Sequence, residues 1–169
     1  LFIPIVNAIP YTENFDQAAA ITEWTVIAPN SAYAGSLNKW CYGTILNNTT
    51  DEAGNLTTGG AYYVSNDNGV TNNYSASYTI STLSTYLTFG DDLSWELSFD
   101  WKCNGETDRD FGRVFLAPID IYVNAGTKIG ANELDTEKYI RLHENDKLSG
   151  SPVWKGESTV VSVKEMTNY

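Results

Sequence analysis

The chain has 169 residues, 21 acidic against 10 basic side chains, a formal net charge of −11 and an aromatic content of 13 %. This negative charge repels the phosphate backbone of nucleic acids, so we expect no nucleic-acid-binding protein. The longest apolar run, residues 1–6, is broken by Pro4 and is far shorter than the ~20 residues of a membrane helix, so we expect no membrane insertion.

Short stretches rich in aromatic and β-branched residues alternate with polar turn sequences along the chain. We expect strands at residues 24–27, 40–46, 61–65, 95–103, 114–116, 119–123, 139–142 and 158–163, and alternating positions near 74–78 and 86–88. One helical turn is expected at residues 18–20, a surface loop at 47–60 and a tight turn at 66–69. Because the sequence lacks the long crossover connections of parallel strands, we expect antiparallel pairing.

Residues 95–103 carry the clearest pattern, with an apolar residue at every odd position and a polar one at every even position. This alternation indicates a strand with one wet and one dry face. The dry face needs a second layer to cover it, so we predict an all-β, antiparallel β-sandwich forming one domain over residues 1–169. Trp24, Trp95 and Trp101 are assigned to its core.

The two cysteines, Cys41 and Cys103, fit either one disulfide or two buried thiols, and their spacing leaves both alternatives open. The chain begins at Leu1 with neither a methionine nor a charged region before an apolar one. We therefore expect a mature or trimmed fragment from which any signal peptide has been removed.

Several motifs occur together in a characteristic order. They are Pro-Tyr-Thr-Glu-Asn-Phe-Asp at residues 10–16, tryptophans at 24 and 40, Ala-Tyr-Tyr-Val-Ser-Asn-Asp at 61–67, and Leu-Ser-Phe-Asp-Trp-Lys-Cys-Asn-Gly-Glu at 97–106. Over residues 8–165 the chain resembles the cleaved-adhesin and choice-of-anchor J domains of bacterial surface proteins, relatives of the MAM-type jelly rolls. The resemblance implies a jelly-roll sandwich, export by bacteria such as the Bacteroidetes, a role in adhesion or glycan binding, and structural calcium. Nothing after Lys164 supplies the final strand and acidic ending of that family, so we expect this strand to be lacking.

The resemblance also implies which residues hold the calcium ion. The acidic positions of the family's Glu-x-Phe-acid motif correspond to Glu13 and Asp16, and the turn that follows the strand at 61–65 adds Asn66 and Asp67. Calcium takes six to eight oxygen ligands, which these side chains and nearby carbonyls can supply in large part. The alternative is that the same residues serve as ordinary cap and turn residues.

Two features of the sequence could indicate catalysis, an acidic pattern and a single histidine, and neither leads us to expect an enzyme. Glu133, Asp135 and Glu137 match the Glu-x-Asp-x-Glu pattern of laminarinase-type glycoside hydrolases, whose carboxylates flank the scissile bond. The flanking residues are not strand-like, and Thr136 occupies a position that is normally apolar, so a solvated charge run is the better interpretation.

His143 is the only histidine and has no serine or cysteine elbow nearby, so we expect a surface or satisfied side chain. No enzyme is predicted.

Aromatic residues with polar neighbours are the candidates for ligand contact, because sugar rings stack on exposed aromatic side chains. Those residues are Trp40, Tyr42, Tyr74 and Trp154. The leading hypothesis is a noncatalytic module, secreted or on the bacterial cell surface, that binds glycans or host glycoproteins, with other domains of a larger surface protein as further partners. The alternatives are a structural spacer without its own ligand and, third, a glycoside hydrolase.

Overall fold

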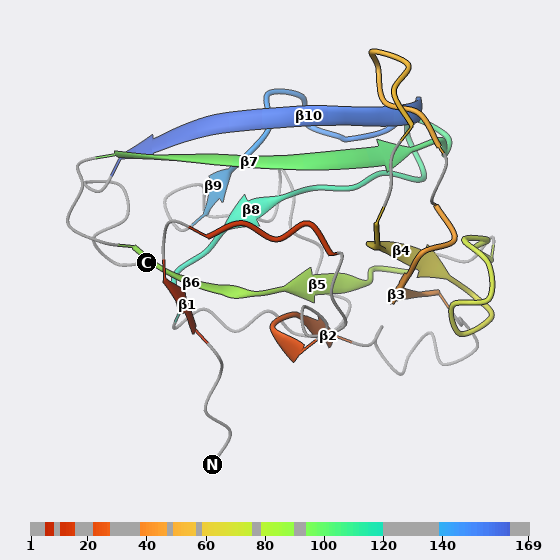
Figure 1. Cartoon of the computed structure of the whole chain (residues 1–169), viewed down its shortest axis with the longest axis horizontal. Coiled ribbons are helices and arrows are strands. Elements are labelled where there is room, and N and C mark those ends of the chain that lie inside the picture. Colours follow the sequence, from red (N-terminus) through yellow and green to blue (C-terminus); the bar gives the residue numbers. More distant parts are fainter. Residues whose placement is uncertain are drawn as a thin grey trace. The chain divides into compact units, whose positions relative to one another are not determined.

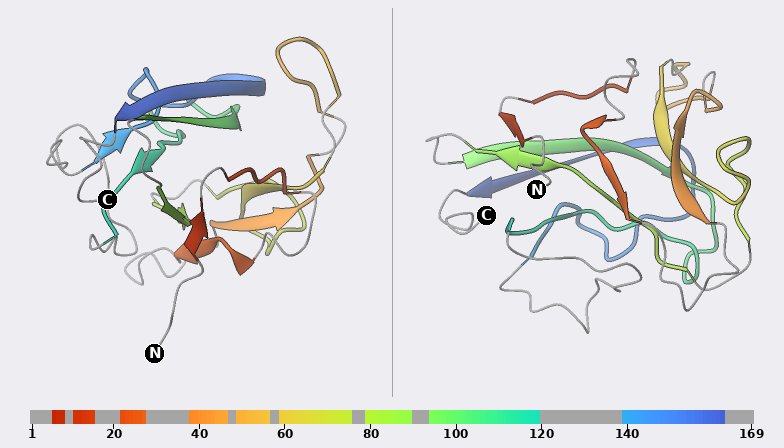
Figure 2. Two further views of the ribbon diagram at one scale, coloured as in Figure 1. Left: turned by 60° about the vertical axis from the view of Figure 1, so that its left-hand side comes forward. Right: turned by 90° about the horizontal axis from the view of Figure 1, so that it is seen from below.

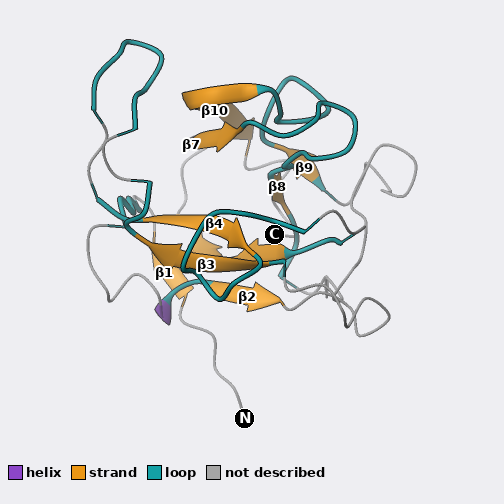
Figure 3. Ribbon diagram, turned by 90° about the vertical axis from the view of Figure 1, so that its right-hand side faces the viewer, coloured by secondary structure: helices purple, strands orange, loops and turns teal. Residues whose placement is uncertain are grey.

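The structure is a computed structural model that describes residues 6–8, 11–15, 22–27, 38–46, 49–56, 59–75, 79–89, 94–119 and 139–162. These residues form strands, turns and loops without an α-helix, which confirms the all-β class; the short purple piece in Figure 3 is a 3-10 turn at Thr22. Within these ranges no helix has the length and hydropathy to cross a membrane. The helical turn expected at 18–20 and most of the strand expected at 119–123 lie outside the described residues.

The described part of the chain contains ten strands, which are labelled in Figure 1. They are β1 (Val6–Ala8), β2 (Thr25–Ile27), β3 (Lys39–Gly43), β4 (Ala61–Ser65), β5 (Thr82–Ser84), β6 (Tyr86–Thr88), β7 (Ser94–Cys103), β8 (Phe115–Leu116), β9 (Ile140–Arg141) and β10 (Ser151–Ser162). They pair two by two as β1–β6, β2–β5, β3–β4, β7–β10 and β8–β9. Four pairs are antiparallel, as predicted.

The pairing of β1 with β6 contradicts the expectation of purely antiparallel strands, because it is parallel, with Val6 opposite Tyr86 and Ala8 opposite Thr88. A parallel pair needs a long connection between its strands. Residues 9–85 connect the two strands, so the connection is long enough for a parallel pair without an additional crossover helix or loop.

The chain gathers into two compact units, each drawn from separated stretches of sequence. Unit 1 comprises Leu1–Asn48, Thr58–Gly90 and Val123–Lys128, and unit 2 comprises Thr49–Thr57, Asp91–Tyr122 and Ile129–Tyr169. Unit 1 therefore contains β1 to β6 and unit 2 contains β7 to β10.

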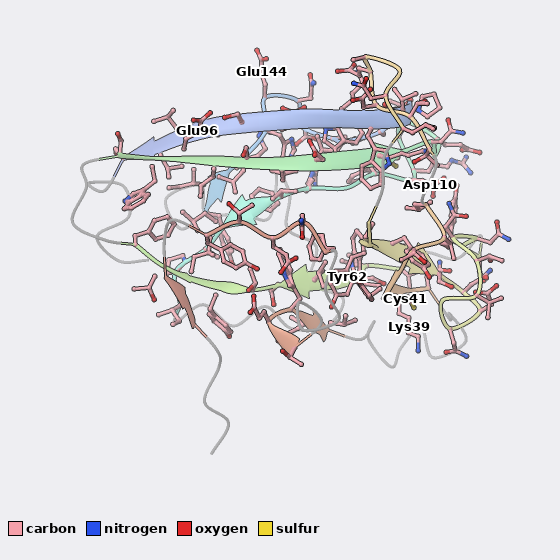
Figure 4. All side chains as sticks on the ribbon, in the orientation of Figure 1. Lys39, Cys41, Tyr62, Glu96, Asp110 and Glu144 are labelled. Carbon is pink, nitrogen blue, oxygen red and sulfur yellow. The ribbon has the colours of Figure 1, made fainter. Side chains whose placement is uncertain are left out.

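Unit 1 is built around the antiparallel pair β3–β4, whose two faces carry different side chains. Tyr42 lies opposite Tyr62, and Cys41 lies opposite Tyr63. Because successive residues of a strand point to opposite faces, Tyr62 and Tyr63 mark the two sides of this ribbon. Figure 4 labels Cys41 and Tyr62 on these two strands.

An aromatic cluster packs on the Tyr62 side of the ribbon. The ring of Phe15 lies 5.6 Å from that of Trp24 and 5.5 Å from that of Tyr62, and Tyr42 packs edge-on against Tyr62 at 5.8 Å. Phe15 has a positive φ of 57°, and its carbonyl oxygen accepts hydrogen bonds from the Tyr42 hydroxyl at 2.6 Å and the Gly60 amide at 3.1 Å. These contacts hold a backbone conformation that a phenylalanine rarely adopts.

Unit 2 contains the long antiparallel pair of β7 and β10, which run side by side in every view (Figures 1 and 2). Exposure alternates along β7 from Ser94 to Trp101, and the apolar residues are the more buried ones. This confirms the alternation predicted for residues 95–103 as far as Trp101. The side chains of Trp95 and Trp101 are half-buried, as is that of Trp24 in unit 1, so the three tryptophans assigned to the core are partly covered. The fully buried residues of β10 are Val161 and Ser151.

Both cysteines are free thiols, so the alternative of a disulfide between them is wrong. Cys41 lies on the Tyr63 side of the unit 1 ribbon. Cys103 ends β7, and its Sγ atom donates to the carbonyl oxygen of Asp110 at 3.4 Å.

Candidate binding loop

The loop from Ser65 to Ser75, which follows β4 in unit 1, is the strongest candidate for a functional site. Its first turn places Asn68 (φ 64°) and Gly69 (φ 90°) in the left-handed region. Asparagine and glycine tolerate this conformation better than other residues, so the Asn66-Asp67-Asn68-Gly69 sequence folds into the tight turn that its composition predicts.

The Asp67 carboxylate stabilises this loop by accepting hydrogen bonds from within it. Its Oδ1 atom accepts hydrogen bonds from the Ser65 hydroxyl at 2.7 Å and the Thr71 amide at 2.9 Å, and its Oδ2 accepts one from the Thr71 hydroxyl at 2.7 Å. The Ser65 hydroxyl oxygen in turn accepts from the Gly69 amide at 2.9 Å. The bonds from Ser65 and then Thr71 stabilise the carboxylate and lower the pKa of Asp67 to about 2.

The base of the loop is closed by backbone and amide hydrogen bonds. The Asn66 amide donates to the Asn73 carbonyl oxygen at 2.9 Å, and Asn66 Nδ2 donates to the Ser75 hydroxyl at 3.2 Å. Asn38, a buried residue just before β3, accepts from the Ser75 amide at 2.7 Å and donates to the Ser75 carbonyl oxygen at 3.0 Å. The loop is therefore anchored at both ends to the β3–β4 ribbon.

The outer side of the loop presents a mixed apolar and polar surface. Val70 is 73 % exposed and Tyr74 is 48 % exposed, and Asn68, Asn72 and Asn73 are also exposed. A tyrosine and a valine among asparagine side chains can offer both an apolar contact and hydrogen bonds to the same ligand. Since the loop is held by its own hydrogen bonds, little order has to be gained on binding.

The other three aromatic candidates are held inside their units. Trp40 Nε1 donates to the Ser81 carbonyl oxygen at 3.0 Å, and Tyr42 donates to the Phe15 carbonyl oxygen. Trp154 lies on β10 in unit 2, where its Nε1 donates to the Thr49 hydroxyl at 2.8 Å. All three are half-buried. Of the four predicted ligand-binding residues, only Tyr74 has a largely exposed side chain.

The predicted calcium ligands Glu13, Asn66 and Asp67 are described, whereas Asp16 lies outside the described residues. Glu13 Oε1 accepts from the Phe15 amide at 2.5 Å, beside the aromatic cluster on the Tyr62 side of the ribbon. Asp67 lies on the Tyr63 side, bonded to Ser65, and both of its oxygens accept protein hydrogen bonds.

Glu13 and Asp67 therefore lie on opposite sides of the ribbon and do not fit one shared calcium cage. Among the described residues no group of three or more His, Cys, Asp or Glu side chains could hold a metal ion. The calcium implied by the resemblance stays a prediction for this chain.

Glu133, Asp135 and Glu137 lie outside the described residues. His143 is described and is buried at 3 % exposure, so of the two expected alternatives, a surface or a satisfied side chain, the surface position is wrong. Its ring packs 6.4 Å from the ring of Phe115 on β8, which removes it from water.

No family model, no curated protein and no solved structure matches this chain. The candidate site therefore rests on the geometry of the chain itself.

Two residues of the candidate site were not predicted from the sequence. Val70 has the sequence neighbours of an ordinary turn residue, and only its exposure makes it a candidate for ligand contact. Asn38 lies far from the loop in sequence, and its clamp on Ser75 spans 37 positions. No local pattern signals such a contact, whereas the Asn-Asp-Asn-Gly sequence did signal the turn.

Proposed function

We propose that the chain is an exported, noncatalytic jelly-roll sandwich that binds carbohydrate through the outer side of the Ser65–Ser75 loop. The observation that carries the proposal is the exposure of Tyr74 on a loop held rigid by its own hydrogen bonds. In this account Tyr74 stacks on the apolar face of a sugar ring, Val70 extends the apolar contact, and Asn73 offers hydrogen bonds to hydroxyl groups.

The charge of the surrounding sequence favours a neutral sugar. Residues 40–101 contain no lysine or arginine, and the pKa of Asp67, lowered by its hydrogen bonds to about 2, keeps that carboxylate ionised at the base of the loop. A glycan that carries sialic acid, uronic acid or sulfate would be repelled there and would find no cation on the loop.

The hydrogen bonds that engage Trp40, Tyr42 and Trp154 support a second candidate, a spacer domain whose aromatic residues serve only packing. A spacer domain binds no ligand and therefore does not require an exposed tyrosine on an ordered loop. For this reason we prefer the binding function. Other domains of a larger bacterial surface protein are expected neighbours in both cases.

A glycan array with plant, mucin and host sets, probed with the whole chain and with Tyr74→Ala, distinguishes the two. Binding to neutral glycans that the substitution removes supports the proposal. Silence across all three sets supports the spacer, and release of sugar from an incubated glucan would support the hydrolase. Treating sialylated glycans with sialidase should increase the signal, because it removes the repelled group.

A further inference from the structure

His143 in unit 2 is the only histidine of the chain and is buried in the turn that follows β9. Its Nδ1 atom is hydrogen-bonded to the carbonyl oxygen of Asn145. A carbonyl oxygen can only accept, so Nδ1 carries the proton and Nε2 is left with its lone pair. Within the described part of the chain, Nε2 is buried without a hydrogen-bond partner.

Charged groups on three elements act on this ring electrostatically. Arg141 comes from β9, Arg113 from the segment before β8 and Glu157 from β10. Burial lowers the pKa of His143 most strongly, and the two guanidinium groups lower it further, while the bond to Asn145 and the Glu157 carboxylate oppose them. The Glu157 carboxylate accepts a hydrogen bond from Trp101 Nε1 at 3.4 Å and none from Nε2 of His143.

The acidic groups that follow His143 do not offer its Nε2 an acceptor either. Asp146 is bonded to Arg113 at 2.7 Å and to Arg141 at 3.3 Å. Glu144, labelled in Figure 4, is exposed to solvent. A proton added to Nε2 would therefore create a buried charged donor without an acceptor, beside two guanidinium groups.

We propose that His143 is an acid-sensitive latch in unit 2, whose protonation at Nε2 releases the segment Ile140–Leu148 from β8 and β10. This segment is held by the β8–β9 pairing, by the ion pairs of Asp146 with Arg113 and of Lys147 with Asp108, and by hydrogen bonds on either side of the histidine. The Leu142 amide donates to the Val114 carbonyl oxygen at 3.0 Å, the Thr159 hydroxyl donates to the Leu142 carbonyl oxygen at 3.1 Å, and Leu148 exchanges two backbone bonds with Gly112.

The direction of the effect follows from the lowered pKa. In the open segment His143 regains its ordinary pKa of 6.5, whereas in the closed segment it stays neutral to lower pH. The closed state is thus fully favoured above about pH 6.5 and is weakened as the pH falls below that value, by at most about tenfold per pH unit.

Nuclear magnetic resonance of the intact chain tests the latch, because a single histidine gives unambiguous imidazole signals. At neutral pH the ring should be the Nδ1–H tautomer. Between about pH 6.5 and pH 5, amide exchange of Leu142 and Leu148, corrected for its intrinsic pH dependence, should accelerate by up to about tenfold per unit. The amide of Thr71 in unit 1 is the internal reference and should not follow.

His143→Gln keeps a donor for the Asn145 carbonyl and cannot titrate, so its exchange should lose this pH dependence. If that variant does not fold, the wild-type titration still decides. An imidazole that titrates at or above its ordinary pKa, or exchange at Leu142 and Leu148 that is independent of pH, overturns the proposal.

Discussion

Among single residues, Tyr74 is the one on which the proposed glycan contact depends most. Tyr74→Ala should weaken glycan binding by about tenfold or more, because truncation of a contacting aromatic commonly costs more than about 1.4 kcal/mol. Tyr74→Phe should retain most of the affinity, since it keeps the ring. Tyr86, another exposed tyrosine on β6, provides the control. Isothermal titration of the three variants checks this, and an equal loss for Tyr86→Ala would contradict a specific role of Tyr74.

Asp67 is a structural residue of the loop, and its pKa determines how the loop responds to acid. Hydrogen bonds from Ser65 and Thr71 lower the pKa from its ordinary value of 3.8 to about 2. The charged form therefore stabilises the loop above about pH 4, and this contribution is lost as the pH falls through about 2.

We expect Asp67→Asn to accelerate amide exchange at Thr71 at neutral pH, equally with calcium and with a chelator. Asp108→Asn, which changes an exposed carboxylate in unit 2, should leave Thr71 unchanged. An effect of Asp67→Asn that appears only with calcium would assign the carboxylate to a metal instead.

At the scale of elements, the clamp of Asn38 on Ser75 joins the loop to the β3–β4 ribbon. Asn38→Ala removes two bonds to the Ser75 backbone and one of 3.0 Å to the Thr79 hydroxyl in a buried position. We expect a loss of about 2–3 kcal/mol in the free energy of unfolding, because buried polar groups remain unsatisfied. Urea denaturation measures it. Asn73→Ala, at an exposed position, is the control, and an equal loss there would argue against the clamp.

Gly60 determines how closely β4 approaches the segment that contains Phe15. A Cβ atom at Gly60 would lie 2.2 Å from the Phe15 carbonyl oxygen, whereas one at Gly54 would meet nothing within 4 Å. Gly60→Ala should therefore cost about 1–3 kcal/mol from overpacking. Gly54→Ala should cost only the left-handed backbone penalty of about 1 kcal/mol. Thermal unfolding of both variants compares them, and a smaller loss at Gly60 would contradict the close packing.

The sequence predicted those elements whose signal is local. The alternation at 95–103 and the apolar run at 61–65 correspond to β7 and β4, because burial of one face imposes that pattern on a strand. The parallel partner of β6 and the first half of β10 were missed. Val6–Ala8 pairs with a strand far along the chain, and Ser151–Gly156 contains a register shift, so neither shows an alternation of its own.

The sequence predicted several residues of the candidate site but not the contacts between them. Tyr74, Asn66 and Asp67 were selected from the sequence, and all three belong to the Ser65–Ser75 loop. Their roles depend on contacts with Ser65, Thr71 and Ser75 that composition does not specify. Residues 74–78 show the alternation of a strand, yet Tyr74 lies in the loop, and the neighbouring Ser75 is hydrogen-bonded to the side chain of Asn38.

At the scale of the whole molecule, the net charge of −11 determines which ligands can approach. If the ligand is a neutral glycan, affinity should change little between low and moderate salt, because no ion pair is formed or screened on binding. Titrations at several ionic strengths check this. A steep fall of affinity with salt would indicate a cationic ligand attracted by the acidic surface, and would contradict the neutral-sugar account.

If the clamped Ser65–Ser75 loop of unit 1 is the binding surface, nuclear magnetic resonance of the chain with its ligand should locate the contact there. Amide signals of the assigned chain are followed while a neutral glycan from the array is added. The account predicts shifts concentrated at residues 66–75, led by Val70, Asn73 and Tyr74, with β7 and β10 unperturbed. Shifts concentrated on β7 and β10, or absent from residues 66–75 while the glycan binds, would contradict it.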